Sequence, residues 1–316
     1  MGKGLFDPFI ENFGVVILDG AMATELEKRG ADLNHVLWSA KLLTENPSLI
    51  KQVHLDYLLA GADIINTASY QANFTGFAQQ GYSKEKSRDL MILATTLALE
   101  AREEFIEINP THKPLPLIAA SVGPYGASLA DGSEYRGNYG LSVEELMNFH
   151  RERMQVFIES GADLLACETI PCLEEAAALI HLLNEFPDVR AWISYSCKNE
   201  KEISDGSSFA EAISLGNKSD QIIAMGLNCT DPQHAESLVK TAVQSGNKPV
   251  VVYPNKGEIY DAKNKCWLPG SAHTDFLQEA IRWRDAGATL IGGCCRTSPE
   301  DIFRLKMALS RNKLPG

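Results

Sequence analysis

A short motif, glycine and alanine followed by aspartate or threonine and then by two apolar residues, occurs three times in this chain. The copies begin at Gly61, Gly161 and Gly287, and each follows a segment with the apolar spacing of a helix. Glycine adopts the left-handed conformation that closes a helix at no steric cost. Each copy therefore predicts the end of a helix and the start of a strand.

Eight apolar runs bounded by turn residues indicate eight strands. They lie near residues 15–19, 63–68, 116–122, 163–168, 191–197, 221–228, 249–254 and 289–293. The runs are continuously apolar instead of alternating with polar residues, which is typical of parallel strands buried on both faces. Eight strands separated by helices predict an α/β fold, a (β/α)8 TIM barrel, as a single domain over residues 1–316.

An open, doubly wound sheet is the competing architecture. The segment after the first strand, residues 18–21, lacks the spaced glycines with which such sheets hold a dinucleotide. We therefore prefer the barrel. The polar, glycine-rich segments 120–141 and 254–274 each follow a strand, so they are expected to be irregular and to lie at the catalytic rim of the barrel.

Helix-start signals precede several helical segments. Asn46 followed by proline opens a helix over residues 46–60, in which His54 is expected on the polar side as a hydrogen-bonding structural residue. Ser142 opens a capping box, and Ser298 followed by proline and two carboxylates opens the last helix. These signals place helices between the predicted strands.

The charge balance limits the class of partner. The chain of 316 residues has a formal net charge of −12 and no run of lysine and arginine. This argues against nucleic acid and anionic membranes and favours small-molecule partners, cationic ones included. Residues 1–12 lack a secretion-signal pattern, and no stretch is apolar for long enough to cross a bilayer, so a cytoplasmic location is expected.

Polar and sulfur-bearing side chains stand at the carboxyl ends of the predicted strands, where barrels place functional groups. They are Asp19, Asn66, Thr67, Ser121, Glu168, Ser196, Asn228, Cys229, Tyr253, Asn255, Cys294 and Cys295. Because parallel strand ends meet at one rim, Cys229 is expected to approach Cys294 and Cys295. Three thiolates with an open fourth position suit a catalytic zinc ion, but buried apolar cysteines or a vicinal disulfide also fit this pattern.

The other cysteines and the two strand-end carboxylates are open to other interpretations. Seven cysteines without framework spacing predict reduced thiols, and four of them are expected to have no part in the site: Cys167, Cys172, Cys197 and Cys266. Asp19 and Glu168 could act as general acid and base, cap the helices that follow them, or hold a substrate ammonium group. No strand-end lysine suggests a Schiff base.

Ten blocks of sequence carry a resemblance to a known family. They are LDGAMATEL (18–26), LWSAK (37–41), VHLDY (53–57), TASYQA (67–72), SVGPYG (121–126), DGSEYRG (131–137), ACET (166–169), NC (228–229), VVYPN (251–255) and GGCCR (292–296). Over essentially its whole length the chain resembles the homocysteine S-methyltransferase family, most closely its bacterial members that use S-methylmethionine.

The resemblance implies a homocysteine-binding barrel domain with one zinc ion per chain. Cys229, Cys294 and Cys295 would be the zinc ligands and would act through the metal without a separate general base. The implied substrate-binding residues are Asp19, Gly20, Ala21, Trp38, Thr67, Tyr70, Ser121, Glu168 and Asn228. Asp19 and Glu168 would bind the amino group of homocysteine, backbone amides near Gly20 and Ala21 its carboxylate, and Trp38 would line the donor pocket.

The expected reaction is the transfer of a methyl group from a sulfonium donor to the thiol of L-homocysteine, which gives methionine in methionine biosynthesis. The donor would be S-methylmethionine or S-adenosylmethionine. The chain lacks the carboxyl-terminal extension through which betaine-using relatives dimerise, so a monomer or weak oligomer is expected. Two alternatives remain open: selenocysteine as the acceptor, or a homocysteine-binding module that serves a separate cobalamin or folate protein.

Overall fold

Eight parallel strands form the centre of the molecule. The computed structural model describes residues 4–33, 41–257, 259–261, 266–268 and 275–310. The strands are β1 (Val16–Ile17), β2 (Ile64–Asn66), β3 (Leu117–Val122), β4 (Leu164–Ile170), β5 (Ala191–Tyr195), β6 (Ile222–Asn228), β7 (Val250–Tyr253) and β10 (Ala288–Ile291). Their spatial order is β1-β10-β7-β6-β5-β4-β3-β2, and a parallel bridge between Leu18 and Ile64 joins the two ends. The predicted (β/α)8 barrel is confirmed.

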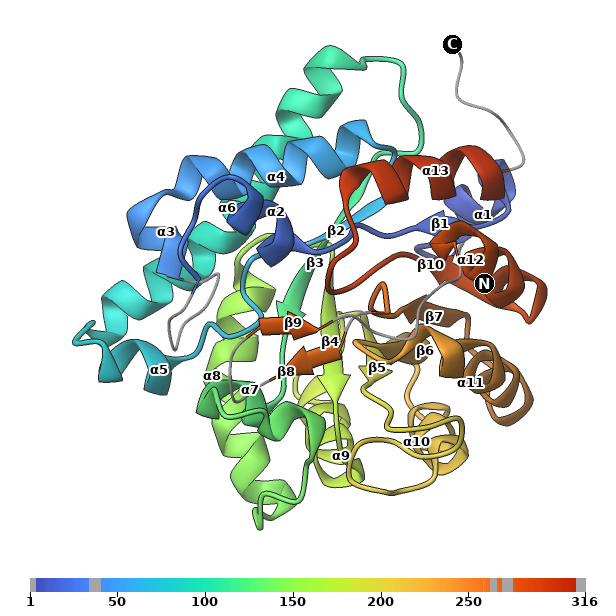
Figure 1. Cartoon of the computed structure of the whole chain (residues 1–316). Helices are drawn as coiled ribbons and strands as arrows, with labels where there is room; N and C mark the ends of the chain where they lie inside the picture. Colours follow the sequence, from blue (N-terminus) through green and yellow to red (C-terminus); the bar gives the residue numbers. More distant parts are fainter. Residues whose placement is uncertain (1–3, 34–40, 258, 262–265, 269–274, 311–316) are drawn as a thin grey trace.

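Helices surround the strands on the outside (Figure 1). They are α1 (Asp7–Phe13), α2 (Met22–Lys28), α3 (Leu42–Glu45), α4 (Pro47–Leu59), α5 (Phe74–Gln79), α6 (Lys84–Ile108), α7 (Tyr125–Leu129), α8 (Val143–Glu159), α9 (Leu173–Leu183), α10 (Phe209–Gly216), α11 (Pro232–Ser245), α12 (Phe276–Asp285) and α13 (Pro299–Leu309). No helix among these is long and apolar enough to span a membrane.

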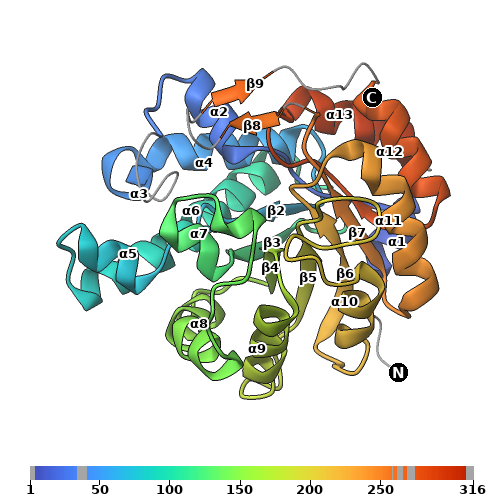
Figure 2. The same ribbon diagram turned by 60° about the horizontal axis from the view of Figure 1, so that its bottom comes forward.

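The two segments predicted to be irregular contain short elements of their own. Residues 120–141 include α7 and a single 3₁₀ turn, η2 (Ser133–Tyr135). Residues 254–274 include an antiparallel hairpin of β8 (Ile259–Asp261) and β9 (Cys266–Leu268), which stands apart from the barrel strands (Figure 2). The expectation of irregular backbone was therefore wrong for the hairpin, whose three-residue strands are too short to give a clear alternating pattern.

The three glycine motifs end helices as the sequence predicts. Gly61, Gly161 and Gly287 have φ angles of 98°, 90° and 114°, in the left-handed region, and β2, β4 and β10 begin within three residues of them. A side chain at these positions would be strained by that φ. The repeated motif thus sets the entry into three of the eight strands.

The aspartates of two of these motifs tie a helix to the strands. Asp63 accepts a hydrogen bond from a backbone N–H of β1 (2.8 Å) and pairs with Lys306 of α13 at 2.7 Å. Both side chains are 1 % exposed, and the Lys306 ammonium lies 3.7 Å from the ring centre of Phe13. Asp163 repeats the arrangement with a backbone N–H of β3 (2.7 Å) and with Arg102 of α6 (2.6 Å), but this second pair is partly hydrated.

The three predicted helix starts are confirmed, but at one of them the expected side-chain cap is absent. Ser142 and Ser298 both form capping boxes at the starts of α8 and α13. Asn46 precedes α4 but makes no side-chain cap; its Oδ1 accepts from Ser48 instead (2.9 Å). The prediction that His54 is a hydrogen-bonding residue on the polar side of the helix was wrong. His54 is fully buried, and neither ring nitrogen has a partner among the described residues. Burial lowers its pKa to about 3.

Apolar side chains form two layers, one between the strands and the outer helices and one inside the barrel. The inner layer includes Trp192 and Tyr253, and the phenylalanines of α1 pack into the same cluster. The interior is therefore a packed core and not a channel, as is usual for this architecture. Functional groups have room only where the strands end.

Candidate active site and metal centre

A cavity of about 450 Å³ opens at the carboxyl ends of the strands. The described residues that the family resemblance implies for the site all line it: Asp19, Gly20, Ala21, Thr67, Tyr70, Ser121, Glu168, Asn228, Cys229, Cys294 and Cys295. Trp38 lies outside the described residues. Asn66 and Tyr253 also line the cavity, whereas the Ser196 hydroxyl contacts the Glu134 carbonyl oxygen (3.1 Å) and Ser204 (2.8 Å).

The three strand-end cysteines come together in this cavity. Cys229 follows β6, Cys294 and Cys295 follow β10, and their Sγ atoms all lie within 4.8 Å of one another. A tetrahedral ion with Zn–S bonds of ~2.3 Å holds its sulfur ligands about 3.8 Å apart. The trio therefore fits a soft metal ion with only small side-chain adjustments, and all three cysteines line the cavity.

The three thiols differ in pKa, and full ionisation of the group requires a bound cation. The pKa of Cys229 lies well below its usual value because Cys294 and Cys295 donate hydrogen bonds to its sulfur, with smaller contributions from Tyr135 and Thr169. The pKa values of Cys294 and Cys295 are raised, first of all by Cys229. One proton leaves easily, but the other two thiols ionise readily only if a positive charge compensates them.

The backbone around the cysteines is held in an uncommon conformation. Cys229 has φ = 46° and Arg296 has φ = 72°, the left-handed region that residues other than glycine seldom occupy. The amide of Cys229 donates to Tyr253 O (3.3 Å), and that of Cys294 donates to Pro254 O (2.8 Å). Non-glycine residues keep such angles only where the surrounding contacts enforce them, and they concentrate at functional sites.

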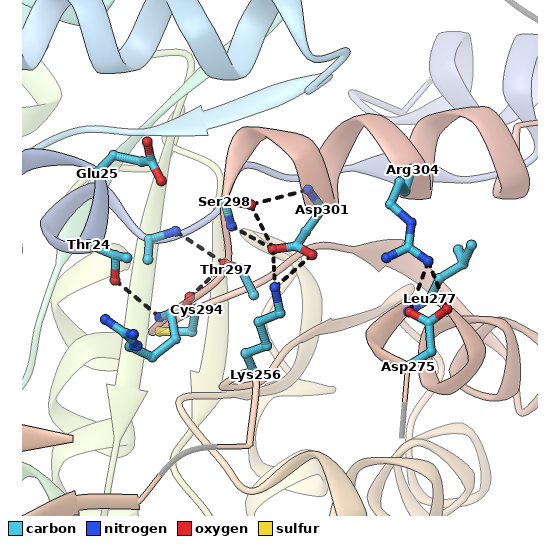
Figure 3. A network of polar contacts seen from close by, with 12 residues as sticks. Thr24, Glu25, Lys256, Asp275, Leu277, Cys294, Thr297, Ser298, Asp301 and Arg304 are labelled. Carbon is cyan, nitrogen blue, oxygen red and sulfur yellow. Dashed lines mark hydrogen bonds and ion pairs between the residues drawn. The ribbon is translucent and has the colours of Figure 1, made fainter. Parts of the chain in front are cut away.

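A polar network fixes the turn that carries Cys294 and Cys295 (Figure 3). The Thr297 hydroxyl donates to Cys294 O at 2.6 Å and accepts from the amide of Ala21 at 3.2 Å. The amide of Lys256 donates to Cys295 O (3.0 Å), and its ammonium binds both oxygens of Asp301 (2.8 and 2.9 Å). The cysteine turn is thereby attached to the starts of α2 and α13 and to the segment after β7.

Glu168 lies beside the thiols on β4. The Ser121 hydroxyl, from β3, donates a hydrogen bond to its carboxylate. Burial raises the pKa of Glu168 to about 7; hydrogen bonds from Ser121 and Tyr253 oppose this shift, and the negative charge of Cys229 adds to it. Glu168 does not cap the following helix, because the N-cap residue of α9 is Cys172, without a side-chain cap.

Asp19, after β1, is the second buried carboxylate of the site. It accepts hydrogen bonds from the backbone N–H of Asn66 (2.7 Å) and from the Asn66 side chain (3.3 Å). Its pKa is raised well above the usual value, mainly by burial and also by the charge of Glu168. The capping hypothesis is wrong here too, since the N-cap residue of α2 is Ala21, without a side-chain cap. Two neighbouring carboxylates in a cavity whose described lining has no basic side chain suit a cationic group.

Asn228 lines the cavity, but its carboxamide mainly joins strands. Oδ1 accepts from the amide of Thr169 (2.7 Å) and from Ser194 Oγ (2.8 Å), and Nδ2 donates to Thr169 Oγ1 (2.8 Å). Thr169 has φ = 62°, at a bulge where the register of β4 against β5 shifts. These bonds hold the end of β4, and thus Glu168, against β5 and β6.

Thr67 and Ser121 connect β2 to β3 at the floor of the cavity. The amide of Ser121 donates to Thr67 Oγ1 (3.1 Å), and the hydroxyls of Thr67 and Ser69 lie 2.7 Å apart. Ser69 Oγ in turn donates to Ser121 O (2.8 Å). These contacts fix the backbone of Ser121, whose hydroxyl donates the hydrogen bond to Glu168.

Several lining residues were not identified as site residues from the sequence. Glu134 and Tyr135, in η2, and Thr169 face the cavity. The available signal was the acidic, aromatic composition of segment 131–137, which the sequence placed at the rim without assigning roles. None of the described lining residues is lysine, arginine or histidine, so every side chain with a formal charge in the described lining is acidic.

The comparisons with known proteins agree on one group of relatives. A family model described as homocysteine S-methyltransferase matches residues 16–309. The chain is 53% identical to homocysteine S-methyltransferase YbgG of Bacillus subtilis, over 93% of this chain and 94% of the relative. It is 46% identical to the selenocysteine Se-methyltransferase of Brassica oleracea, over 96% and 92%.

A solved structure gives the same result. The metallated form of the homocysteine methyltransferase MmuM from Escherichia coli superposes with a TM-score of 0.86 at 43% identity. The match covers 95% of this chain and 98% of that one. The likeness therefore extends over nearly the whole length of both chains.

Proposed function

The chain belongs to the homocysteine S-methyltransferase family, and from this premise we propose that it moves a methyl group from a sulfonium donor to the thiol of L-homocysteine with the help of one zinc ion. S-methylmethionine and S-adenosylmethionine are the proposed donors, and methionine is the proposed product. The observation that carries the proposal is the convergence of three thiols beside two buried carboxylates in a cavity whose described lining has no basic side chain.

Cys229, Cys294 and Cys295 would hold the zinc ion. When bound there, zinc would keep the sulfur of homocysteine ionised at neutral pH, where a free thiol with a pKa of ~8.5 is mostly protonated. This accounts for the absence of histidine and lysine from the described lining of the cavity. The second and third thiols, whose pKa values are raised, also need that positive charge in order to ionise.

Asp19 and Glu168 would bind the ammonium group of homocysteine. Ser121 and Asn66 already direct both carboxylates into the cavity by hydrogen bonds. The substrate carboxylate would lie near the start of α2, where backbone N–H groups favour anions. The amide of Ala21 donates to Thr297, so Gly20 is the stronger candidate for that contact.

The cavity would then hold acceptor and donor in line for displacement at the methyl carbon. Well-oriented reactants can save roughly 7–11 kcal/mol of the barrier, so precise placement is a large part of the catalysis required. Tyr70 lines the cavity and offers an aromatic face to the positive sulfonium, a contact worth about 0.5–2 kcal/mol. The pKa of Tyr70 is raised well above its usual value, mainly by burial, so the ring carries no charge of its own.

Methionine formation by the purified, reduced, zinc-loaded protein tests the proposal. We expect turnover with homocysteine and at least one sulfonium donor, about one zinc per chain, and loss of both after chelation. Activity that requires an added cobalamin or folate protein would favour the binding-module alternative. Turnover without stoichiometric metal would contradict the proposed role of the thiols.

Selenocysteine is the second candidate acceptor. The relative from Brassica oleracea is named for that substrate and is 46% identical to this chain. A selenol could occupy the same fourth position as a thiol, since both are soft ligands. The ratio of kcat/KM for the two acceptors with one donor decides between them.

Replacing Glu168 by glutamine is expected to weaken homocysteine binding about 10- to 100-fold, because it removes a charged hydrogen-bond acceptor worth about 1.5–3 kcal/mol. Zinc content should remain near one per chain, since Glu168 is not among the three ligands. Calorimetric titration with homocysteine and elemental analysis measure the two effects. Unchanged homocysteine affinity would leave Glu168 with only a structural role.

A further inference from the structure

Glu134 lies in a fixed turn at the rim of the cavity. It belongs to η2, between β3 and α8, and it lines the cavity together with Tyr135. Ser196 donates to its carbonyl oxygen (3.1 Å). The turn packs so closely on α7 that a Cβ atom at Gly126 would lie 2.5 Å from the Glu134 nitrogen. The backbone from which this side chain projects is therefore fixed by its surroundings.

One oxygen of the Glu134 carboxylate has no hydrogen-bond partner among the described residues. Its Oε2 atom is buried and makes no hydrogen bond to any described residue. The neighbouring base, Arg136, instead donates to Ser133 Oγ (2.8 Å) and pairs with Asp131 (3.4 Å). A buried, unpaired carboxylate oxygen is costly, and such groups in native structures call for an explanation such as a bound ligand.

Six acidic residues line the cavity: Asp19, Glu27, Asp32, Asp131, Glu134 and Glu168. Among them, only Glu134 has a buried carboxylate oxygen without a hydrogen-bond partner in the described part of the chain. Asp19 and Glu168 come from the ends of β1 and β4. They lie close enough that the charge of Glu168 contributes to the raised pKa of Asp19, whose main cause is burial. Glu134 comes from the segment between β3 and α8, and its charge acts on Tyr70 and Tyr135. Burial raises the pKa of Glu134 to about 7, with a further contribution from Cys229.

We propose that Glu134 binds the positively charged methyl donor, while Asp19 and Glu168 bind the ammonium group of homocysteine. This inference rests on the proposed function and adds a donor-specificity residue to it. Both substrates carry an ammonium group, and the donor carries a sulfonium besides, so the donor needs an acidic contact of its own, which the otherwise unpaired Oε2 of Glu134 supplies. Both candidate donors carry a sulfonium and an ammonium group, so the same contact serves either of them.

The test is Glu134→Gln, which keeps the shape of the side chain and removes its charge. We expect kcat/KM for the donor to fall about 10- to 100-fold with both S-methylmethionine and S-adenosylmethionine, as for loss of a charged contact. The KM for homocysteine and the zinc content should stay at the wild-type level. Glu134→Asp should recover part of the loss, and Glu144→Gln, an exposed site on α8, is the matched control.

The possible failures can be told apart. A wild-type protein that turns over neither sulfonium would overturn the proposed function itself. A wild-type protein that is active, with an unchanged donor kcat/KM in Glu134→Gln, would overturn only this inference. An equal loss for donor and acceptor together with a lower zinc content would assign Glu134 to maintenance of the metal site and would also overturn the inference. Thermal unfolding of each variant checks that the fold is retained.

Discussion

Serine at position 229, 294 or 295 is expected to abolish metal retention and to slow methyl transfer by about a thousandfold or more. The three sulfurs lie within 4.8 Å of one another, and they are the only group of described histidine, cysteine and acidic side chains arranged to hold an ion. A metal contributes several kcal/mol of charge stabilisation at a reacting atom, and 1.36 kcal/mol corresponds to a factor of ten in rate.

Elemental analysis after chelator washing, followed by the methionine assay, measures both effects. Cys172→Ala is a suitable control, because Cys172 is a buried free thiol away from the trio and its pKa is raised by burial. Normal metal content in Cys229→Ser, Cys294→Ser or Cys295→Ser would remove that residue from the ligand set.

The second large effect is expected at the buried ion pair. Asp63→Ala should lower the free energy of unfolding by about 3–5 kcal/mol, because it leaves the ammonium of Lys306 buried without its partner. It also removes the acceptor for a backbone N–H of β1. Denaturant unfolding, followed by circular dichroism, measures the change.

Asp163→Ala is the matched control, since Asp163 occupies the same place in its motif but pairs with a partly hydrated arginine. The decrease in the free energy of unfolding should be clearly smaller for Asp163→Ala than for Asp63→Ala. Adding Lys306→Met to Asp63→Ala should restore part of the stability by removing the unpaired charge. If Asp63→Ala and Asp163→Ala lowered the free energy of unfolding equally, burial of the Asp63–Lys306 pair would not add to the cost of removing its carboxylate.

The fold could be predicted because its signals are local and repeated. Each strand is a continuous apolar run, and each of the three glycine motifs marks a helix end in the left-handed region. The meeting of Cys229 with Cys294 and Cys295 followed from topology alone, since parallel strand ends share one rim. Their role as metal ligands came from the family resemblance, because the spacing also suited buried cysteines.

Features that depend on neighbours distant in the sequence could not be predicted. The helical position of His54 suggested a polar face, yet α4 is covered on that side and the residue is fully buried. The unpaired oxygen of Glu134 depends on where Arg136 points, which no spacing rule reveals. The strand-joining bonds of Asn228 likewise require β4, β5 and β6 to be in place.

The acidic lining also affects how the enzyme releases its products. A sulfonium loses its positive charge when its methyl group departs, so the thioether left behind is no longer attracted to the carboxylates through sulfur. We expect the demethylated donor to dissociate from the cavity faster than the unreacted donor does. Product inhibition at the donor subsite should therefore be weak, and increasing ionic strength should reduce the capture rate of the donor more than the departure rate of the product.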